Sequence, residues 1–159
     1  MLCSTLTHPE ILGSLARAGH GSRVLIADGN YPFSTGANPA GDRVFLNLTP
    51  GIPLATDVLR ALLTAIPVEA AHVMVPPEGP EPPIFAEFRG LLGNDIPLQS
   101  LGRFEFYEAA RGQDTALVVA TGEQRVYANV LLTIGVVPPP MGERHSKRSP
   151  ARAGQGLSV

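Results

Sequence analysis

A short apolar run, Arg23–Ala27, lies between a glycine-flanked histidine, His20, and an aspartate, Asp28. Such a run is typical of a strand buried on both faces of a sheet. A helical stretch precedes it, and Gly19 suits the left-handed position that closes a helix. Residues 29–32 have the composition of a turn. Because ligands of open α/β sheets gather beyond the carboxyl ends of the strands, Asp28 falls where a ligand can bind. His20 can join it if neighbouring loops or subunits fold over.

Apolar runs and amphipathic stretches alternate along the rest of the chain. The first helix has a capping-box spacing, Thr7-x-x-Glu10, with Pro9 in its first turn. Further helices are expected from Leu54 to Pro67 and over residues 84–92 and 103–111, the last with its aromatic side chains buried. Further strands are expected over residues 44–48, 72–75, 96–101, 116–120 and 130–137, the last closing the sheet. The alternation predicts an α/β chain: a single three-layer αβα domain with a mostly parallel sheet.

The composition changes at residue 138. Residues 1–137 contain the periodic apolar segments and form the predicted domain. Residues 138–159 are rich in proline, glycine, serine and basic residues, which predicts a disordered tail because such a segment buries too little apolar surface to offset its ordering entropy.

Charge and motifs narrow the classes of function. The formal net charge is −2 with both signs scattered, which argues against binding to nucleic acid or a membrane surface. No segment has the pattern of a membrane span or a signal peptide, and the single cysteine, Cys3, suits a reducing cytoplasm. The chain has no Walker, GxGxxG, HExxH or GxSxG motif, and its four histidines lack metal-ligand spacing. We therefore expect no cofactor and no metal.

A small set of polar residues remains at the expected element ends, and each has two interpretations. His20 suits acid/base chemistry near neutral pH or a helix-end cap. Asp28 can bind a hydroxyl or cap the next turn, and Arg103 can bind an oxygen-rich ligand or lie in solvent. Tyr127 and Asn129 share one face of an expected strand, where they can bind hydroxyls or nearby backbone. Together these residues describe a neutral, hydroxyl-binding site with one titratable group, for which a sugar is a plausible ligand.

Three segments, taken in order, resemble one known family. HPEIL…LARAGHGSRVLIADGNYP, RFEFYEAA and TGEQRVYANVLLTIGV are similar to the ribose-pyranase and fucose-mutarotase family, RbsD/FucU, over residues 6–137. The RFEFYE segment and the turn after Asp28 look more like the fucose branch than the ribose branch.

The resemblance implies an activity and a site. It implies a monosaccharide mutarotase that interconverts the α and β anomers of a sugar such as L-fucose, with D-ribose pyranase or a non-catalytic sugar-binding or transport-associated protein as alternatives. The family's catalytic histidine falls on His20, and its sugar-binding residues fall on Asp28, Arg103, Tyr127, Ala128 and Asn129. The resemblance also implies a ring of subunits, possibly a decamer, with sites at subunit borders.

Overall fold

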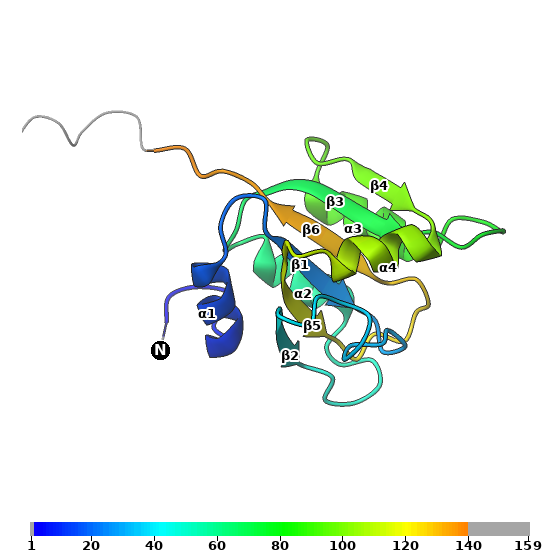
Figure 1. Cartoon of the computed structure of the whole chain (residues 1–159), viewed down its shortest axis with the longest axis horizontal. Helices are drawn as coiled ribbons and strands as arrows, with labels where there is room; N and C mark the ends of the chain where they lie inside the picture. The colour runs from blue at the N-terminus through cyan, green and yellow to red at the C-terminus, as the bar shows by residue number, and fades with distance from the viewer. Residues whose placement is uncertain (1, 140–159) are drawn as a thin grey trace, which may run out of the picture.

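The computed structural model describes residues 2–139, and in them helices and strands alternate along the chain (Figure 1). The helices are α1 (Pro9–Arg17), α2 (Ala55–Leu62), α3 (Ile84–Leu92) and α4 (Arg103–Arg111). The strands are β1 (Arg23–Ala27), β2 (Asp42–Phe45), β3 (Val68–Met74), β4 (Leu98–Leu101), β5 (Thr115–Ala120) and β6 (Val130–Ile134). The expected tail lies outside the described residues except for 138 and 139, so its disorder stays a prediction.

One six-stranded sheet, in the order β2-β5-β1-β6-β3-β4, forms the middle of the fold. β1, β2 and β5 pair in parallel, as do β3 and β4, whereas β6 is antiparallel to both of its neighbours, β1 and β3. Five strands therefore run in one direction. The expectation that the last strand closes the sheet was wrong, because β6 is inserted in its centre. This insertion brings the residues that precede β6 to the same edge as the carboxyl ends of the other five strands.

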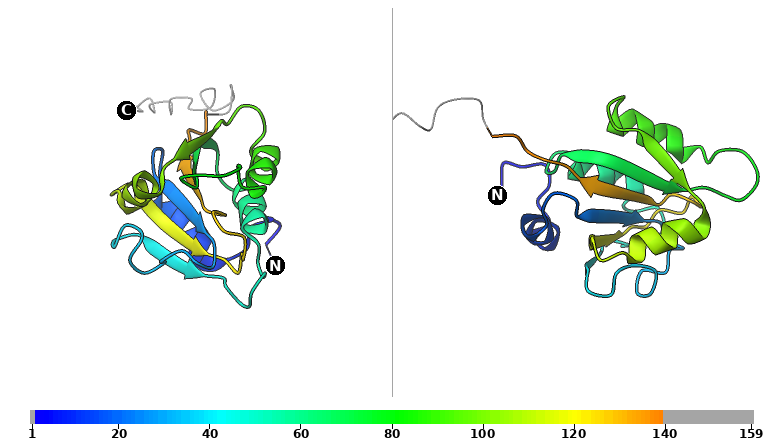
Figure 2. Two further views of the ribbon diagram at one scale, coloured as in Figure 1. Left: turned by 90° about the vertical axis from the view of Figure 1, so that its right-hand side faces the viewer. Right: turned by 45° about the horizontal axis from the view of Figure 1, so that its top comes forward.

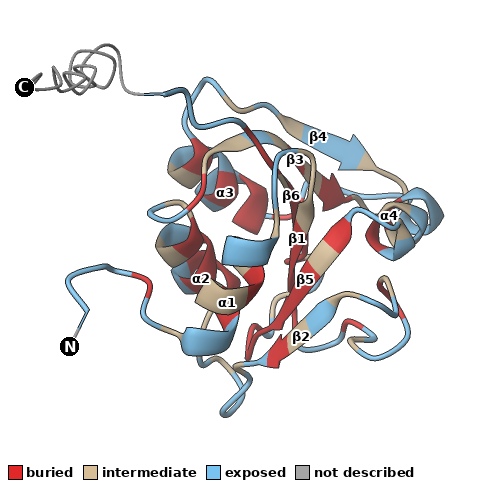
Figure 3. Ribbon diagram, turned by 60° about the vertical axis from the view of Figure 1, so that its left-hand side comes forward, coloured by how far each residue is buried: buried red, intermediate tan, exposed pale blue. Residues whose placement is uncertain are grey.

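Both faces of the sheet are covered, which confirms the three-layer α/β prediction. Side chains alternate along β1: Val24 and Ile26 pack with α1, α2 and α3, while Leu25 and Ala27 pack with Phe106 of α4 and with Tyr31 of the following loop. Figures 1 and 2 show α4 on one side of the sheet and α2 and α3 on the other. In Figure 3 the buried residues are concentrated on the central strands and on the helix faces that meet them, whereas the edge strand β4 is largely exposed.

Several element ends differ from the sequence predictions. His8, not Thr7, caps α1: Pro9 takes the first helical position, and His8 Nδ1 accepts a hydrogen bond from the Ile11 amide at 3.4 Å. Gly19 does not close the helix in the left-handed region, because the chain leaves α1 through an extended Ala18. The left-handed turn falls instead at Gly21, where φ is 82°.

Three further details correct the predictions. β2 begins at Asp42 and ends at Phe45, since its pairing with β5 stops there. α2 ends at Leu62, and a turn over residues 63–66 separates it from Pro67. On α4, Phe106 is buried but Phe104 is 80% exposed, because it faces away from the sheet.

Candidate functional site

A pocket of about 260 Å³ lies at the edge of the sheet where the parallel strands end. It is lined by residues that follow β1, by the last residue of β3, by residues in the first turns of α4 and by the segment that precedes β6. Its lining residues are Asp28, Asn30, Tyr31, Met74, Arg103, Tyr107, Val126, Tyr127 and Asn129. The structure therefore brings Asp28, Arg103, Tyr127 and Asn129 together, although up to 101 residues separate Asp28 from Asn129 in sequence.

Asp28 is the hydrogen-bonding centre of this pocket and is only 2% exposed. Its Oδ1 accepts from the Asn30 amide at 2.9 Å. Its Oδ2 accepts from the Ala128 amide at 3.2 Å and from Asn129 Nδ2 at 2.9 Å. Burial raises the pKa of the Asp28 carboxyl above its ordinary value, and the hydrogen bonds from Asn30, Ala128 and Asn129 oppose that rise. Most of the carboxylate's acceptor capacity is used within the protein, so Asp28 organises the wall of the pocket.

Tyr127 ends a turn, and residues 128 and 129 lead from it into β6, so Tyr127 and Asn129 precede the strand and do not alternate along it as the sequence predicted. Tyr127 has φ of 62°, and among the described residues it is the one non-glycine residue with a positive φ. Ala128 is fully buried and contributes its amide to Asp28. The Asn129 side chain bonds to Asp28 at both ends, since its Oδ1 also accepts from the Asp28 amide at 2.8 Å. Tyr127 and Asn129 reach the same pocket because of this left-handed turn, not because of strand alternation.

Arg103 is exposed at the first position of α4 and supplies a positive charge to the pocket. Its guanidinium carbon lies 5.9 Å from the centre of the Tyr107 ring, and that of Arg111 lies 5.7 Å from the same ring. Within residues 2–139 no carboxylate forms an ion pair with Arg103. The cation is therefore available to an oxygen-rich ligand.

His20 lies away from this pocket, at the opposite edge of the sheet. It is exposed in the loop that precedes β1, where its Nε2 is 3.0 Å from Glu69 Oε2 at the start of β3. An ionised carboxylate only accepts hydrogen bonds, so Nε2 is the donor in this contact, and Nδ1 makes no hydrogen bond within residues 2–139. At about 3.3 Å per residue, β1 alone separates His20 from Asp28 by roughly 16 Å. Within one chain the two residues do not converge.

Sequence reasoning missed five residues of the pocket wall. Asn30 and Tyr31 lay in a segment that was interpreted only as a turn, and Met74 only as part of an apolar strand. Tyr107 was interpreted as core or rim, and Val126 carried no polar signal. Tyr31 also shapes the wall of the pocket. Its buried hydroxyl donates to the Gly36 carbonyl oxygen at 2.6 Å and so closes the loop after β1.

A larger hollow, of about 450 Å³, adjoins the pocket and shares Asn30 with it. The turns that follow β1, β2 and β5 line this hollow. Arg103 and Asn129 line the smaller pocket and not the larger one. The smaller pocket therefore has a cation, Arg103, that the larger hollow lacks and that can orient an oxygen-rich ligand.

Two structural features bear on other classes of function. In the described part of the chain, no three histidine, cysteine, aspartate or glutamate side chains are grouped as metal ligands would be. No helix within residues 2–139 has the length and apolar character needed to cross a bilayer.

Comparison with known proteins identifies the relatives of this chain. It is 35% identical over 148 residues to a protein named fucose mutarotase from Danio rerio, covering 86% of this chain and 92% of that protein. It is 34% identical over 133 residues to a D-ribose pyranase from Paracidovorax citrulli, covering 84% and 96% respectively. The crystal structure of the fucose mutarotase from Streptococcus pneumoniae in complex with L-fucose superposes with a TM-score of 0.69 at 28% identity, over 82% of this chain and 94% of that one. The sequence pattern of the RbsD / FucU transport protein family matches residues 1–137, and the chain belongs to this family.

Proposed function

We propose that this protein is an isomerase, a mutarotase that interconverts the α and β anomers of a monosaccharide such as L-fucose. The observation that carries the proposal is the pocket at the carboxyl edge of the sheet, which presents a cation, amides and hydroxyls in about 260 Å³. That volume lies below the range of about 300–1,000 Å³ typical of sites for drug-sized ligands, and it suits a single sugar ring. The named relatives support the same sugar class.

The chemistry needs one proton-transfer group and several positioning groups. Ring opening requires a proton on the ring oxygen and removal of the proton from the anomeric hydroxyl. We assign this exchange to His20, since its Nδ1 can accept a proton from the anomeric hydroxyl and the protonated ring can donate one to the ring oxygen. Arg103 and Tyr127 bind sugar hydroxyls, while Asp28, Ala128 and Asn129 fix the pocket wall against which the sugar lies. Positioning matters because the open-chain aldehyde must be retained and turned before the ring closes.

A site that uses His20 together with this pocket needs a second copy of the chain. Each copy carries the pocket at one edge of the sheet and His20 at the other, so a complete site forms where the His20 loop of one copy meets the pocket of its neighbour. Different surfaces of the two copies then touch, and such head-to-tail contacts close into rings. Val126, which lines the pocket, and Phe104, which follows Arg103 on α4, are 63% and 80% exposed and give the neighbour an apolar surface to cover. We therefore propose a homo-oligomer larger than a dimer, such as a decamer, with no nucleic-acid or membrane partner.

Saturation-transfer NMR on L-fucose and D-ribose tests the activity. We expect the protein to accelerate exchange between the two anomeric proton signals of L-fucose in proportion to its concentration. Faster conversion between pyranose and furanose forms of D-ribose, without an effect on L-fucose, would instead identify a ribose pyranase. Binding of either sugar with no acceleration would identify a non-catalytic sugar-binding protein.

Light scattering tests the assembly that this mechanism requires. We expect a mass well above that of a dimer at micromolar protein, whereas a monomer would contradict a site shared between copies.

We also propose the cytoplasm as the compartment, because the exposed thiol of Cys3 persists most readily in a reducing environment. Cell fractionation checks this location.

A further inference from the structure

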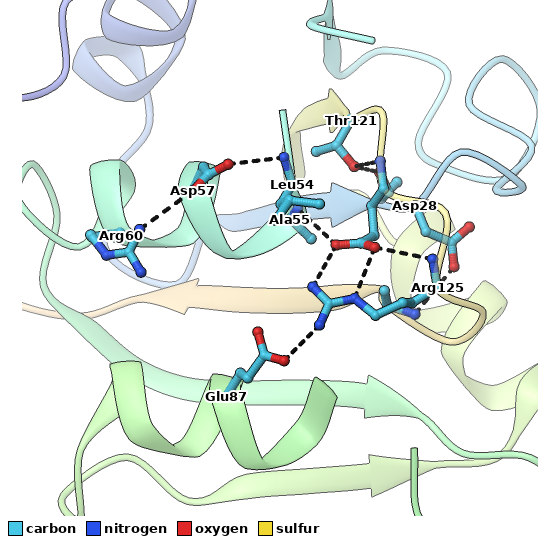
Figure 4. Close-up of polar contacts among 11 residues, drawn as sticks. Asp28, Leu54, Ala55, Asp57, Arg60, Glu87, Thr121 and Arg125 are labelled. Atoms are coloured by element: carbon cyan, nitrogen blue, oxygen red, sulfur yellow. Dashed lines mark hydrogen bonds and ion pairs between the residues drawn. The ribbon is translucent and has the colours of Figure 1, made fainter. Parts of the chain in front are cut away.

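An ion pair between the buried carboxylate of Glu123 and the partly exposed guanidinium of Arg125 lies directly upstream of residues 127–129 of the pocket. Glu123 lies three residues after the end of β5 at Ala120 and is 1% exposed, and its carboxylate binds both the side chain and the backbone of Arg125. Glu123 Oε1 accepts from the Arg125 amide and from Arg125 Nε, both at 3.0 Å, and Oε2 accepts from Arg125 Nη2 at 2.9 Å. Figure 4 shows how these bonds close the turn on itself.

The same pair ties the turn to two helices. Glu123 Oε2 accepts from the Ala55 amide at 3.3 Å, at the amino end of α2, where the helix dipole favours a negative charge. Arg125 Nη1 donates to Glu87 Oε1 on α3 at 2.6 Å. The Arg125 guanidinium and the backbone bonds outweigh burial and lower the pKa of Glu123, while Glu123 raises the pKa of Arg125. Both groups therefore stay charged at neutral pH.

The turn held in this way contains the strained residue of the pocket. A side chain at φ near +60° is disfavoured and persists where the surroundings determine it from both sides. Downstream of Tyr127, Asp28 binds the Ala128 amide and the Asn129 side chain. Upstream, the nearest fixed point is Arg125. Without it, residues 125–127 lose the bonds that oppose relaxation of Tyr127 to a negative φ.

We propose that Glu123 and Arg125 are positioning residues for sugar binding, which hold residues 125–129 in the conformation that presents Tyr127 to the pocket. This inference rests on the proposed function, because it names how that site is kept in shape. An ion pair with one buried partner is a weak source of stability, since desolvation of the Glu123 carboxylate offsets its attraction to Arg125. Its geometry, with Arg125 gripped through both its backbone and its side chain, instead fixes the course of the chain.

A charge-balanced variant separates positioning from stability. The double substitution Glu123→Gln with Arg125→Met removes the pair without leaving a buried charge, and Arg125→Lys keeps the charge but loses the planar fork. The matched control is Arg89→Met on α3, the helix that also carries Glu87. It removes the two hydrogen bonds of Arg89 to Glu81, each at 2.6 Å. All variants are compared by cooperative thermal unfolding before sugar is added.

We expect at least about a tenfold rise in KM for L-fucose in the double variant and in Arg125→Lys, with kcat changed by less than about threefold because the substitutions leave His20 and its contact with Glu69 intact. Arg89→Met should change KM by less than about twofold, as a surface ion pair does. A double variant that folds and keeps the wild-type KM would overturn the inference, as would an equal rise in Arg89→Met.

Amide hydrogen exchange gives a readout that does not depend on sugar. We expect the Ala128 amide to exchange at least about tenfold faster in the double variant than in the wild type, while amides of β1 are unchanged. If the wild type neither binds nor converts sugar, the proposed function fails, and the Ala128 result alone decides whether the pair holds the turn. Unchanged Ala128 exchange would overturn the inference.

Discussion

Removal of the Asp28 carboxylate tests how the pocket wall is held together. In Asp28→Ala, the Ala128 amide and Asn129 Nδ2 lose their acceptor and remain buried, whereas Asn30 is exposed and its amide can turn to water. Each buried donor left unsatisfied costs about 1–3 kcal/mol, so the two together predict a loss of about 2–6 kcal/mol in the free energy of unfolding. We expect the lower half of that range, since water can enter from the open pocket.

Asp28→Asn is the matched control for this loss. Its amide oxygen can take the place of Oδ2 and keep the bonds from Ala128 and Asn129, so its NH₂ group opposes only the exposed Asn30 amide. We expect it to cost about 1 kcal/mol. Urea unfolding at one fixed protein concentration measures both variants, because assembly makes stability depend on concentration. A loss of less than about 0.5 kcal/mol in Asp28→Ala, within the range of ordinary surface substitutions, would refute this account, as would equal losses in the two variants.

The raised pKa of Asp28 gives this prediction a dependence on pH. The folded carboxyl binds its proton more tightly than the unfolded one, whose pKa is near 3.8. The stability linked to that proton is therefore fully present below pH 3.8 and is lost as pH rises through the folded pKa. Since Asp28→Asn cannot titrate, the advantage of the wild type over this variant should shrink from acid towards neutral pH in urea unfolding.

Three further predictions concern other residues. Arg103→Ala should weaken L-fucose binding by about 1–3 kcal/mol, roughly 5- to 150-fold. Its melting temperature should be unchanged because the side chain is exposed. Isothermal calorimetry measures the affinity, and an unchanged affinity would place Arg103 outside the site. Glu123→Gln should show the opposite pH trend to Asp28→Asn, because the folded pKa of Glu123 is lowered. The stability advantage of the wild type over this variant is therefore full above about pH 4.5 and is lost as pH falls through the folded pKa. Urea unfolding at several pH values measures this advantage. Gly122→Ala should destabilise the fold by about 2–3 kcal/mol, because the added Cβ would lie 2.3 Å from the Ile52 carbonyl oxygen. Gly90→Ala, on the exposed face of α3 with no atom within 4 Å of the added Cβ, should stabilise the fold slightly. Thermal unfolding of both variants checks the two expectations.

Local sequence patterns predicted the elements whose first and last residues are defined by a change in residue type. Arg23–Ala27 and Ile84–Leu92 match the structure because an apolar run and a proline-bounded amphipathic segment each define both ends. The position of β6 could not be predicted in this way. Its apolar run indicates burial, but strand order depends on which pairings fill both faces of the sheet, and no local pattern carries that information.

The site shows the same division. A polar residue after a parallel strand predicted the place of Asp28 at the carboxyl edge of the sheet, where it lines the pocket. Tyr127 and Asn129 were expected together for the wrong reason, since their shared side comes from the φ of 62° at Tyr127 and from bonds to Asp28, 100 and 101 residues away. The role of Glu123 was not predicted, because a glutamate in a turn gives no sign that it will be buried against the end of α2.

Complementation between two inactive variants tests most directly whether His20 of one copy serves the pocket of another. His20→Ala removes the proton-transfer group, and Arg103→Glu spoils the pocket while placing an acidic residue in the first turn of α4, where helices tolerate it. Each variant alone should show anomer exchange of L-fucose at least about tenfold below the wild type. The two are co-expressed with different affinity tags, and assemblies that carry both tags are measured by saturation-transfer NMR. In randomly mixed rings, about a quarter of the borders join an intact pocket to an intact His20, so we predict recovery towards a quarter of wild-type exchange. No recovery in mixed assemblies would contradict a site built from two copies.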